Sequence, residues 1–455
     1  MKKFLFFDYR EIETVQGFTR VLERPVKHPD NPLFVAEKPW ENGNMQLYGS
    51  VMKVEGRPFQ MWYSVIHRPW RMVLAYAESE DGIVWKKPAL DSFTHEGRNT
   101  NIVFTNDPHG PAVIYDADDP REDWRYKMVA GAAPSGCICA YRSPDGIRWT
   151  PVRRFPGIVT NPDCPMGFLR TPDGRYAVYH RLHGYGRRVF RSESWDFVYW
   201  TGEPRMVMEP DAGDPPNVQF YGMGSAPYGP YEIGTLWIYR TSLEEFGPNN
   251  MNGYQEAELA YARSGYAWHR AAQGTPFVPH GQGNAWDRGN LQCASAPVYL
   301  EDEIRYYYMG TDMTHRVHWE LEPQRAGLGM AAMKPDRFVS LCAEAEPAAL
   351  MTGGFRLSAT EITVNACTEK DGWVQVGIAT PDGKPIQGLS EEDSIQIKGD
   401  VYSHVVRWRG MSAQDLPAGQ TVRLRIRAKN ARIYAISLHE SDETPAYHQF
   451  DAARL

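Results

Sequence analysis

The feature that most constrains the fold of this chain is a turn signature, Ser-x-Asp-Gly-x-x-Trp, that recurs along the sequence. It is complete at residues 79–85 and 143–149, looser at 194–200, degenerate at 264–268, and reduced to an Asp and an aromatic residue at 336–338. The aligned positions are 64, 51, 69 and 71 residues apart, and a strand-like segment precedes each copy. This spacing is about that of one four-stranded propeller blade with its loops. The repeat therefore predicts an all-β chain containing a five-bladed β-propeller.

The residue types in the signature suit a hairpin turn. Asp and Gly accept the backbone conformations of a tight turn, and the Trp three residues after the Gly is expected to pack back between blades. Trp85 and Trp149 are thus predicted at equivalent positions of the first two blades.

The sequence changes character after about residue 345. Alternating apolar runs at 373–378, 403–408 and 421–426 are separated by Pro-Asp-Gly and Pro-Ala-Gly, a pattern typical of short strands in a small two-sheet sandwich. A chain of 455 residues also exceeds the size at which a single core stops growing. We therefore expect residues 1–345 to form the propeller, as the catalytic domain, and residues 346–455 to form a C-terminal β-sandwich.

Composition excludes several classes of function. The net charge is −7 and no block of Lys and Arg occurs, so a nucleic-acid partner is not expected. No apolar stretch approaches the roughly 20 residues that cross a bilayer, and the apolar run at 4–7 is too short for a secretory signal. The six cysteines form no CxxC pair, which favours reduced thiols and a cytoplasmic location. Homo-oligomerisation stays open.

Several motifs together resemble glycoside hydrolase family 32 and its clan-J relatives, which combine a five-bladed propeller with a β-sandwich. The segments that carry the resemblance are 38–41, 48–51, 61–63, 79–85, 125–127, 227–228, 285–289, 336–341, 382–388, 399–400 and 406–408. The resemblance implies a glycosidase with a carbohydrate substrate. It also implies counterparts of two family motifs, Arg-Asp-Pro at Asn106-Asp107-Pro108 and Glu-Cys-Pro at Asp163-Cys164-Pro165.

The sequence departs from family 32 in the first blade. The family takes its nucleophilic Asp from a Trp-Met-Asn-Asp-Pro-Asn-Gly stretch, whereas the corresponding residues 42–48 contain no carboxylate. The nucleophile must therefore be replaced, or the mechanism must differ.

Glycoside cleavage requires one carboxyl group to protonate the leaving oxygen and a second to attack the anomeric carbon or activate water. The innermost strand of each blade starts at the mouth of a propeller funnel, so acids near these starts can converge from distant sequence positions. Five positions fit: Glu41, Asp107, Asp163, Glu256 and Asp287. We predict Asp163, Glu256, Asp287 and Asp107 as catalytic and Glu41 as substrate-binding. Asp163 and Asp107 also have a structural alternative as a turn or cap, Asp287 as a loop residue, and Glu41 as an interblade contact.

Candidates from different blades across an open funnel favour a wide separation and inversion of configuration. An inverting pair stands about 6.5–9.5 Å apart, and a retaining pair about 5–5.5 Å. Glu258, two residues beyond Glu256, is an alternative on the same strand face.

Further residues are predicted to bind the sugar. Trp286 offers a stacking face, and the polar or aromatic candidates are Tyr221, His109, His183 and His315. No zinc motif of the His-Glu-x-x-His kind occurs, so no metal ligands and no cofactor are predicted. A structural cation in the propeller channel stays open.

Two alternatives to hydrolysis stay open as well. A glycoside phosphorylase would need an anion site, which Arg181, Arg187, Arg188 and His183 are placed to provide. A propeller that binds sugar without cleaving it would also explain the vacant first-blade position.

Overall fold

The structure is a computed structural model. It describes residues 2–41, 45–67, 71–132, 137–152, 158–160, 162–182, 186–201, 203–242, 251–315, 325–412 and 415–440. Apart from two short 3₁₀ turns, η1 (Pro39–Glu41) and η2 (Glu122–Trp124), and single helical residues at 315 and 415, the regular elements in these ranges are β-strands. The predicted all-β class is confirmed.

The described residues divide into two compact units. The first combines residues 2–24 with residues 334–440, and the second contains residues 25–333. The chain thus begins in the first unit, builds the whole of the second, and returns to finish the first.

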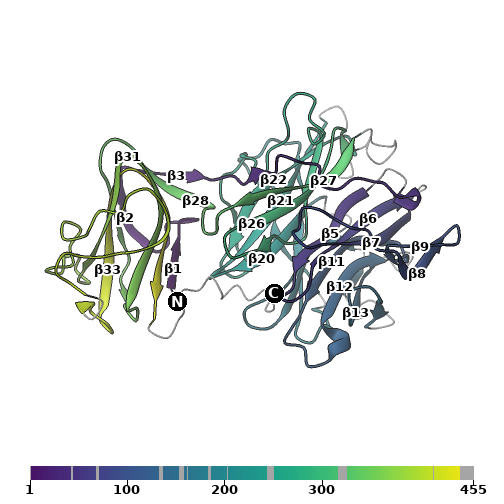
Figure 1. Ribbon diagram of the computed structural model, residues 1–455, viewed down its shortest axis with the longest axis horizontal. Helices are drawn as coiled ribbons and strands as arrows, with labels where there is room; N and C mark the ends of the chain where they lie inside the picture. The colour runs from purple at the N-terminus through teal and green to yellow at the C-terminus, as the bar shows by residue number, and fades with distance from the viewer. Residues whose placement is uncertain are drawn as a thin grey trace. The chain divides into compact units, whose positions relative to one another are not determined.

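The first unit is organised around one long bent strand, β33 (Thr421–His439), which is labelled with its neighbour β31 (Glu361–Ala379) in Figure 1. The other strands that pair with β33 are β1 (Lys2–Leu5), β28 (Val339–Ala343), β29 (Ala348–Thr352) and β30 (Phe355–Arg356). Beyond these, β2 (Ile12–Gln16) pairs with β29, β3 (Phe18–Leu22) with β28, and β32 (Asp400–Val405) with β31.

This division differs from the boundary expected at residue 345. Residues 2–24 belong with the C-terminal part because β1, β2 and β3 each pair with one of its strands. Residues 334–345 lie in the same unit, since β28 pairs with both β3 and β33. The sequence pattern identified strands here, but pairing between strands more than 300 residues apart leaves no local signal.

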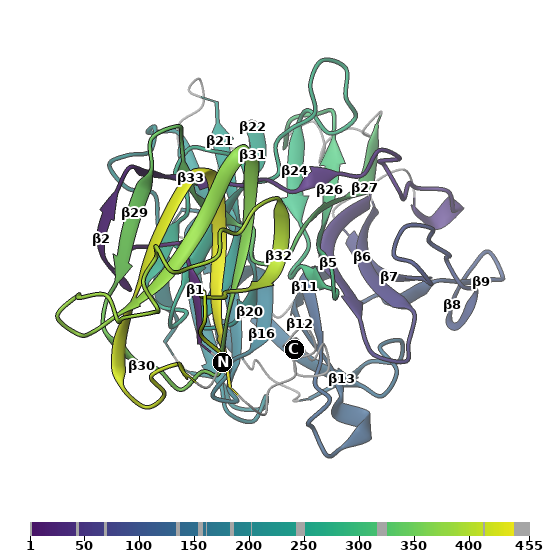
Figure 2. The ribbon, with the colours of Figure 1, turned by 60° about the vertical axis from the view of Figure 1, so that its left-hand side comes forward.

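The second unit begins with three antiparallel sheets in chain order. The first contains β5 (Met45–Lys53), β6 (Phe59–His67), β7 (Arg71–Ser79) and β10 (Ile102–Phe104). The second contains β11 (Pro108–Tyr115), β12 (Tyr126–Ala132), β13 (Cys137–Ser143), β14 (Thr150–Pro151) and β15 (Ile158–Thr160). The third contains β16 (Pro162–Arg170), β17 (Tyr176–Leu182), β18 (Val189–Ser194) and β19 (Arg205–Met208). Figure 2 shows β5, β6 and β7 side by side; a separate hairpin joins β8 (Leu90–His95) to β9 (Arg98–Thr100).

A nine-stranded sheet completes the second unit and consists of two antiparallel halves. One half contains β20 (Val218–Tyr228), β21 (Tyr231–Thr241), β22 (Gly253–Ala262) and β23 (Trp268–Arg270). The other contains β24 (Asn290–Cys293), β25 (Val298–Tyr299), β26 (Ile304–Thr311), β27 (Ala326–Met333) and β4 (Val26–Lys27). A single parallel pairing, Gln255 with Asn290, joins the halves. The outermost strand β4 comes from the beginning of this unit, so its two ends meet in one sheet.

The repeated turns share one pattern of internal hydrogen bonds, and they also hold neighbouring sheets together. In the first turn, Asp81 Oδ1 accepts hydrogen bonds from the backbone N–H groups of Ile83 and Val84 at 2.8 and 2.9 Å, and Ser79 Oγ accepts one from Gly82. The same pattern recurs around Asp145 and around Asp196.

Each of three turns also accepts a hydrogen bond from a central strand of another sheet. Trp62 of β6 donates to the Gly146 carbonyl at 2.7 Å, and Tyr179 of β17 donates to that of Gly265 at 3.2 Å. Tyr307 of β26 donates to the Gly82 carbonyl at 2.8 Å. The first turn of the unit therefore contacts its last sheet.

The two predicted tryptophans pack against neighbouring sheets. Trp85 meets Tyr307 edge-on, with ring centroids 5.8 Å apart. Trp149 packs against a core cluster that includes Trp62 and Tyr126.

Candidate functional site

Distant parts of the chain meet at the strands that come first in each sheet or half of a sheet. These strands are β5, β11, β16, β20 and β24. β11 contacts β5 and β16, β16 contacts β20, and β24 contacts β5. We call the end at which these strands begin the entry end.

Four aromatic rings gather near the entry end. Tyr48 comes from β5, Tyr221 from β20, and Trp237 and Tyr239 from one face of β21. The Trp237 ring stacks on Tyr48 with centroids 5.7 Å apart, and on Tyr221 at 6.4 Å. Tyr239 meets Tyr221 edge-on at 5.5 Å. All four rings are buried.

Two guanidinium groups and an imidazole join these rings. Arg181 of β17 lies 4.2 Å from the Tyr221 ring centroid, and Arg187 lies 5.2 Å from it. His315 Nε2 is 2.8 Å from the Tyr221 hydroxyl. Cations over ring faces are stabilised by the ring quadrupole, more so when desolvated. Tyr48, Tyr221, Trp237, Tyr239, Arg181, Arg187 and His315 are called the entry cluster below.

A short chain of polar atoms runs through the entry cluster. The Tyr48 hydroxyl donates to the Tyr221 hydroxyl at 3.2 Å, and Tyr221 meets His315. Burial raises the pKa of Tyr48 well above its ordinary value, and the neighbouring Tyr221 and Cys164 raise it further, while Arg181 acts in the opposite direction. Tyr48 is therefore a neutral hydrogen-bonding group at physiological pH.

Of the predicted carboxylates, Glu41 is the most fully engaged. It is completely buried and accepts hydrogen bonds from the backbone of Glu37 and Lys38 and from the hydroxyl of Tyr63. Lys87 pairs with it at 2.8 Å. These contacts favour the structural alternative for Glu41.

Asp107 and Glu256 occupy different settings. Asp107 accepts a hydrogen bond from the backbone N–H of Met72 at 2.7 Å and so caps the start of β7. Glu256, in β22, is 7% exposed and pairs with Arg240 at 2.7 Å. Glu258 is fully buried and is held by Arg270 through two hydrogen bonds, which again favours a structural role.

Asp287 lies just before β24 and is buried. Its Oδ2 accepts hydrogen bonds from Lys27 Nζ at 2.5 Å and from the Tyr308 hydroxyl at 3.0 Å. Burial and then the Asp287 charge raise the pKa of Tyr308. Trp286, the predicted stacking residue, is half-buried and stacks on Tyr308 with centroids 5.8 Å apart.

Two other predicted residues are only partly described. Asp163 lies in β16, where its Cα partner is Arg181, but its side chain lies outside the described residues, as does all of His183. His109 is half-buried and meets the Tyr48 ring at 5.7 Å. The structure therefore brings Tyr221, His109 and His315 together, and the backbone of Asp163 pairs beside them.

Sequence reasoning did not select Tyr48, Trp237 or Tyr239. Trp237 and Tyr239 stand two residues apart in a strand, so they share a face. That spacing was visible in the sequence, but many strands here carry aromatic residues, and only the fold shows which ones meet.

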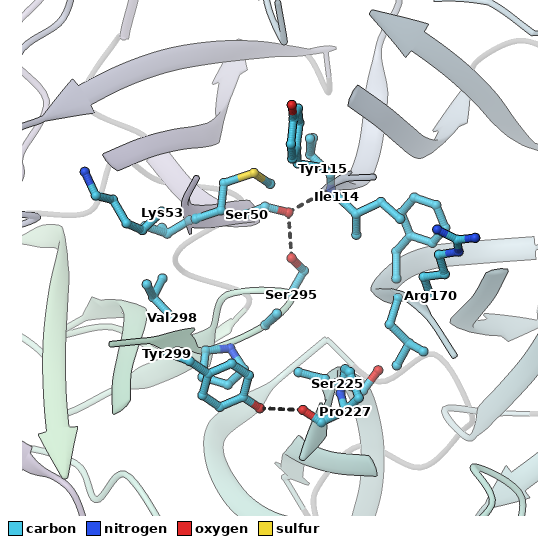
Figure 3. A pocket seen from close by; sticks show the side chains of 18 of the residues that line it. Ser50, Lys53, Ile114, Tyr115, Arg170, Ser225, Pro227, Ser295, Val298 and Tyr299 are labelled. Atoms are coloured by element: carbon cyan, nitrogen blue, oxygen red, sulfur yellow. Dashed lines mark hydrogen bonds between the residues drawn. The ribbon is translucent and has the colours of Figure 1, made fainter. Parts of the chain in front are cut away.

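A cavity of about 70 Å³ lies at the other end of the first strands. Its lining comes from the second halves of β5, β11, β16 and β20 and from residues 295–299, and it is mainly apolar (Figure 3). In Figure 3 the hydroxyls of Ser50 and Ser295 point toward one another, and they are 2.6 Å apart. Ser50 Oγ also accepts a hydrogen bond from the backbone of Val113. This cavity contains none of the predicted site residues.

In the part of the chain that the structure describes, no three His, Cys, Asp or Glu side chains come together to hold a metal ion. Among the same residues, no helix has the length and apolar character needed to cross a bilayer.

No protein-family model and no curated protein matches the sequence. Among solved structures, one similar chain is from the GH130 family of mannoside phosphorylases, which contains glycoside hydrolases that target β-1,2-mannosidic linkages in Candida mannan. It is 17% identical, covers 71% of this chain and 95% of its own, and has a TM-score of 0.47. A glycosyl hydrolase from Bacteroides ovatus is 15% identical, with coverages of 72% and 98% and a TM-score of 0.47.

A family 43 arabinoxylan arabinofuranohydrolase from Bacillus subtilis, in complex with cellotetraose, is 10% identical. It covers 90% of this chain and 97% of its own, with a TM-score of 0.42. The identities and TM-scores are low, and neither fixes the activity of this chain. The resemblance to family 32 is not confirmed by these comparisons.

Proposed function

We propose that the second unit is a five-bladed propeller that cleaves a glycosidic bond at its entry end, and that the first unit is a β-sandwich. The blades would be the three separate sheets and the two halves of the nine-stranded sheet. Two contacts support ring closure: β4 pairs with β27, and the Gly82 turn accepts a hydrogen bond from Tyr307.

The proposed function rests on the entry cluster. Sugar rings present apolar C–H faces and hydroxyl groups, so their sites combine aromatic side chains with a few placed donors and acceptors. Tyr48, Tyr221, Trp237 and Tyr239 supply a buried aromatic support, while Arg181, Arg187 and His315 supply polar groups beside it. Arg187 and the neighbouring His109 keep part of their surface exposed.

Asp163 and Glu256 are the proposed working carboxylates. Asp163 pairs through its backbone with Arg181, which places it in the strand next to the entry cluster. Glu256 is buried in β22 and pairs with Arg240 at 2.7 Å. In this proposal Asp163 protonates the leaving oxygen and Glu256 activates the attacking water.

The test is a screen of aryl-glycosides and oligosaccharides with chromatographic detection of products. We expect at least one glycoside to be cleaved, and Asp163→Asn to lower its turnover by about a hundredfold or more, as removal of a general acid does. Asp382→Asn is the control, because Asp382 is a largely exposed turn residue of the first unit. Full turnover in Asp163→Asn would remove this residue from the mechanism. Binding of a sugar without turnover would instead identify a non-catalytic propeller.

A phosphorylase is the second candidate, and the two arginines over Tyr221 favour it. Arg181 and Arg187 bring two guanidinium groups within about 5 Å of one ring, and such groups recognise phosphate. Arg188 is less suited, since it pairs with Glu209 at 2.9 Å. Running the screen with and without inorganic phosphate separates the candidates, because a phosphorylase releases a sugar phosphate and requires phosphate for turnover.

A further inference from the structure

Two aromatic side chains stand out in the third copy of the repeated turn. Trp195 is 72% exposed and Tyr199 is 65% exposed, the two most exposed aromatic rings among the described residues. They flank Asp196 in the short turn between β18 and β19. Ser194, where that turn begins, pairs with Tyr176 of β17, and Tyr176 pairs on its other side with Arg170 at the end of β16. The pair therefore lies at the opposite end of this sheet from Asp163 and Arg181.

The repeat supplies an internal comparison. The positions equivalent to Trp195 and Tyr199 are Glu80 and Val84 in the first turn, and Pro144 and Arg148 in the second. All three turns keep the same Ser and Asp hydrogen bonds. Neither aromatic residue is thus required to form the turn, and only the third copy carries rings at both outward positions.

The turn holds these rings on a rigid support. Asp196 Oδ1 accepts hydrogen bonds from the backbone of Val198 and Tyr199, both at 2.8 Å. Between the two exposed residues, Phe197 is completely buried and stacks on Phe168 with centroids 5.7 Å apart.

Paired charged groups border the Trp195 ring. The Arg175 guanidinium lies 5.4 Å from the Trp195 ring centroid. It is paired with Asp173 at 2.7 Å and also with Glu193. The Arg175 cation is therefore paired, and Arg175 and Asp173, whose side chains stay partly exposed, offer donors and acceptors beside the indole.

These features select the kind of partner. An aromatic side chain buries about 150–250 Å² when fully covered, so this pair offers at most about 500 Å². A stable protein interface needs about 800 Å² on each partner, and a neutralised arginine gives no attraction for an ionic ligand. Two exposed rings edged by hydrogen-bonding groups fit the apolar face and hydroxyls of a neutral sugar chain.

We propose that Trp195 and Tyr199 form a secondary binding surface for a neutral oligo- or polysaccharide, separate from the entry cluster. The choice of a saccharide rests on the proposed function, whereas the location rests on the exposed rings and the internal comparison. Stacking on this surface would hold the enzyme on a polymeric substrate without contributing to bond cleavage.

The experiment is affinity electrophoresis of the full chain in gels containing xylan, mannan, β-glucan, starch or fructan. Trp195→Glu and Tyr199→Val introduce the residues that the first turn already carries, so the turn is expected to persist. We expect one polysaccharide to retard the wild type, and each variant to weaken that retardation about tenfold, the effect of one lost aromatic contact. Val84→Ala, at an exposed position of the first turn, is the control and should bind as the wild type does.

Retardation that is unchanged in the Trp195→Glu/Tyr199→Val double variant would overturn the proposal, as would the absence of retardation by every polymer. Sedimentation of the same proteins addresses the remaining alternative: a wild-type dimer that dissociates in the double variant would assign the surface to a second copy instead. Because the readout is binding, the result is independent of turnover. If no glycoside is cleaved but retardation still depends on Trp195, the proposed function fails and this surface stands.

Discussion

At the scale of single residues, His180 shows how burial fixes a protonation state. It is 2% exposed, with Nδ1 3.0 Å from the Arg181 carbonyl and Nε2 3.0 Å from Ser192 Oγ. A carbonyl only accepts, so Nδ1 carries the proton and Nε2 accepts from the serine. Burial lowers the pKa of His180 to about 4.

This histidine predicts a loss of stability in acid. An unfolded histidine titrates near 6.5, so between about pH 4 and 6.5 the unfolded state binds a proton that the folded state does not. The stabilisation is complete above pH 6.5 and falls by about 2 kcal/mol at pH 5. Urea unfolding of the wild type and of His180→Gln at pH 7.5 and pH 5 measures this difference, since the variant should lose about 2 kcal/mol less. Equal losses in both proteins would contradict the assignment.

The same scale explains which site residues the sequence identified. Residue type and position near a strand start selected Glu41 and Asp287, and in the structure these two carboxylates are held by Lys87 and Lys27. A carboxylate in a structural ion pair and one in an active site look alike in sequence. They differ in their partners, which here come from 46 and 260 residues away.

At the scale of elements, the repeated turn is the part of the fold that the sequence predicted best. Asp and Gly stand where backbone N–H groups need an acceptor and where φ is positive. Gly146 has φ of 76°, and an added Cβ would lie 2.6 Å from Cζ2 of Trp62. Gly56 has φ of 71° and no atom within 4 Å of such a Cβ.

These two glycines make a matched pair of variants. Gly56→Ala should cost about 1–2 kcal/mol, the strain of a left-handed backbone. Gly146→Ala should cost about 1–3 kcal/mol more, because it also forces a methyl group against a completely buried ring. Denaturant unfolding of both variants gives the comparison, and equal destabilisation would show that the turn does not press on Trp62.

At the scale of the whole molecule, the first residues of the second unit pair with its last strand. Lys27 of β4 pairs with Asp287, which is 2% exposed. Lys27→Met would leave that carboxylate without its cation and should lower the free energy of unfolding by about 2–3 kcal/mol, reduced from the cost of a fully buried pair because Lys27 is partly exposed.

A double-mutant cycle with Asp287→Asn tests this pairing. The cost of Lys27→Met should largely disappear when Asp287 is already neutral. Additive losses would mean that the two residues act independently. A loss of turnover in Asp287→Asn without loss of stability would return Asp287 to its predicted catalytic role.

The sequence predicted the strands and the turns, but not that residues 2–24 pair with strands of the C-terminal part. Periodicity reports local structure, and the strands of 12–16 and 18–22 have ordinary patterns. Their partners in β29 and β28 follow only from the fold, since the pairing spans most of the chain.

The pairing of β1, β2 and β3 with strands near the other end of the sequence has a consequence for synthesis on the ribosome. Strands β1 to β3 leave the exit tunnel first, yet their partners follow only after the roughly 300 residues of the second unit have been translated. At about 5–20 residues per second, this delay is roughly 15–60 s. The second unit is then complete before the first can begin to assemble, and residues 2–24 stay unpaired until residues 334–440 have been translated.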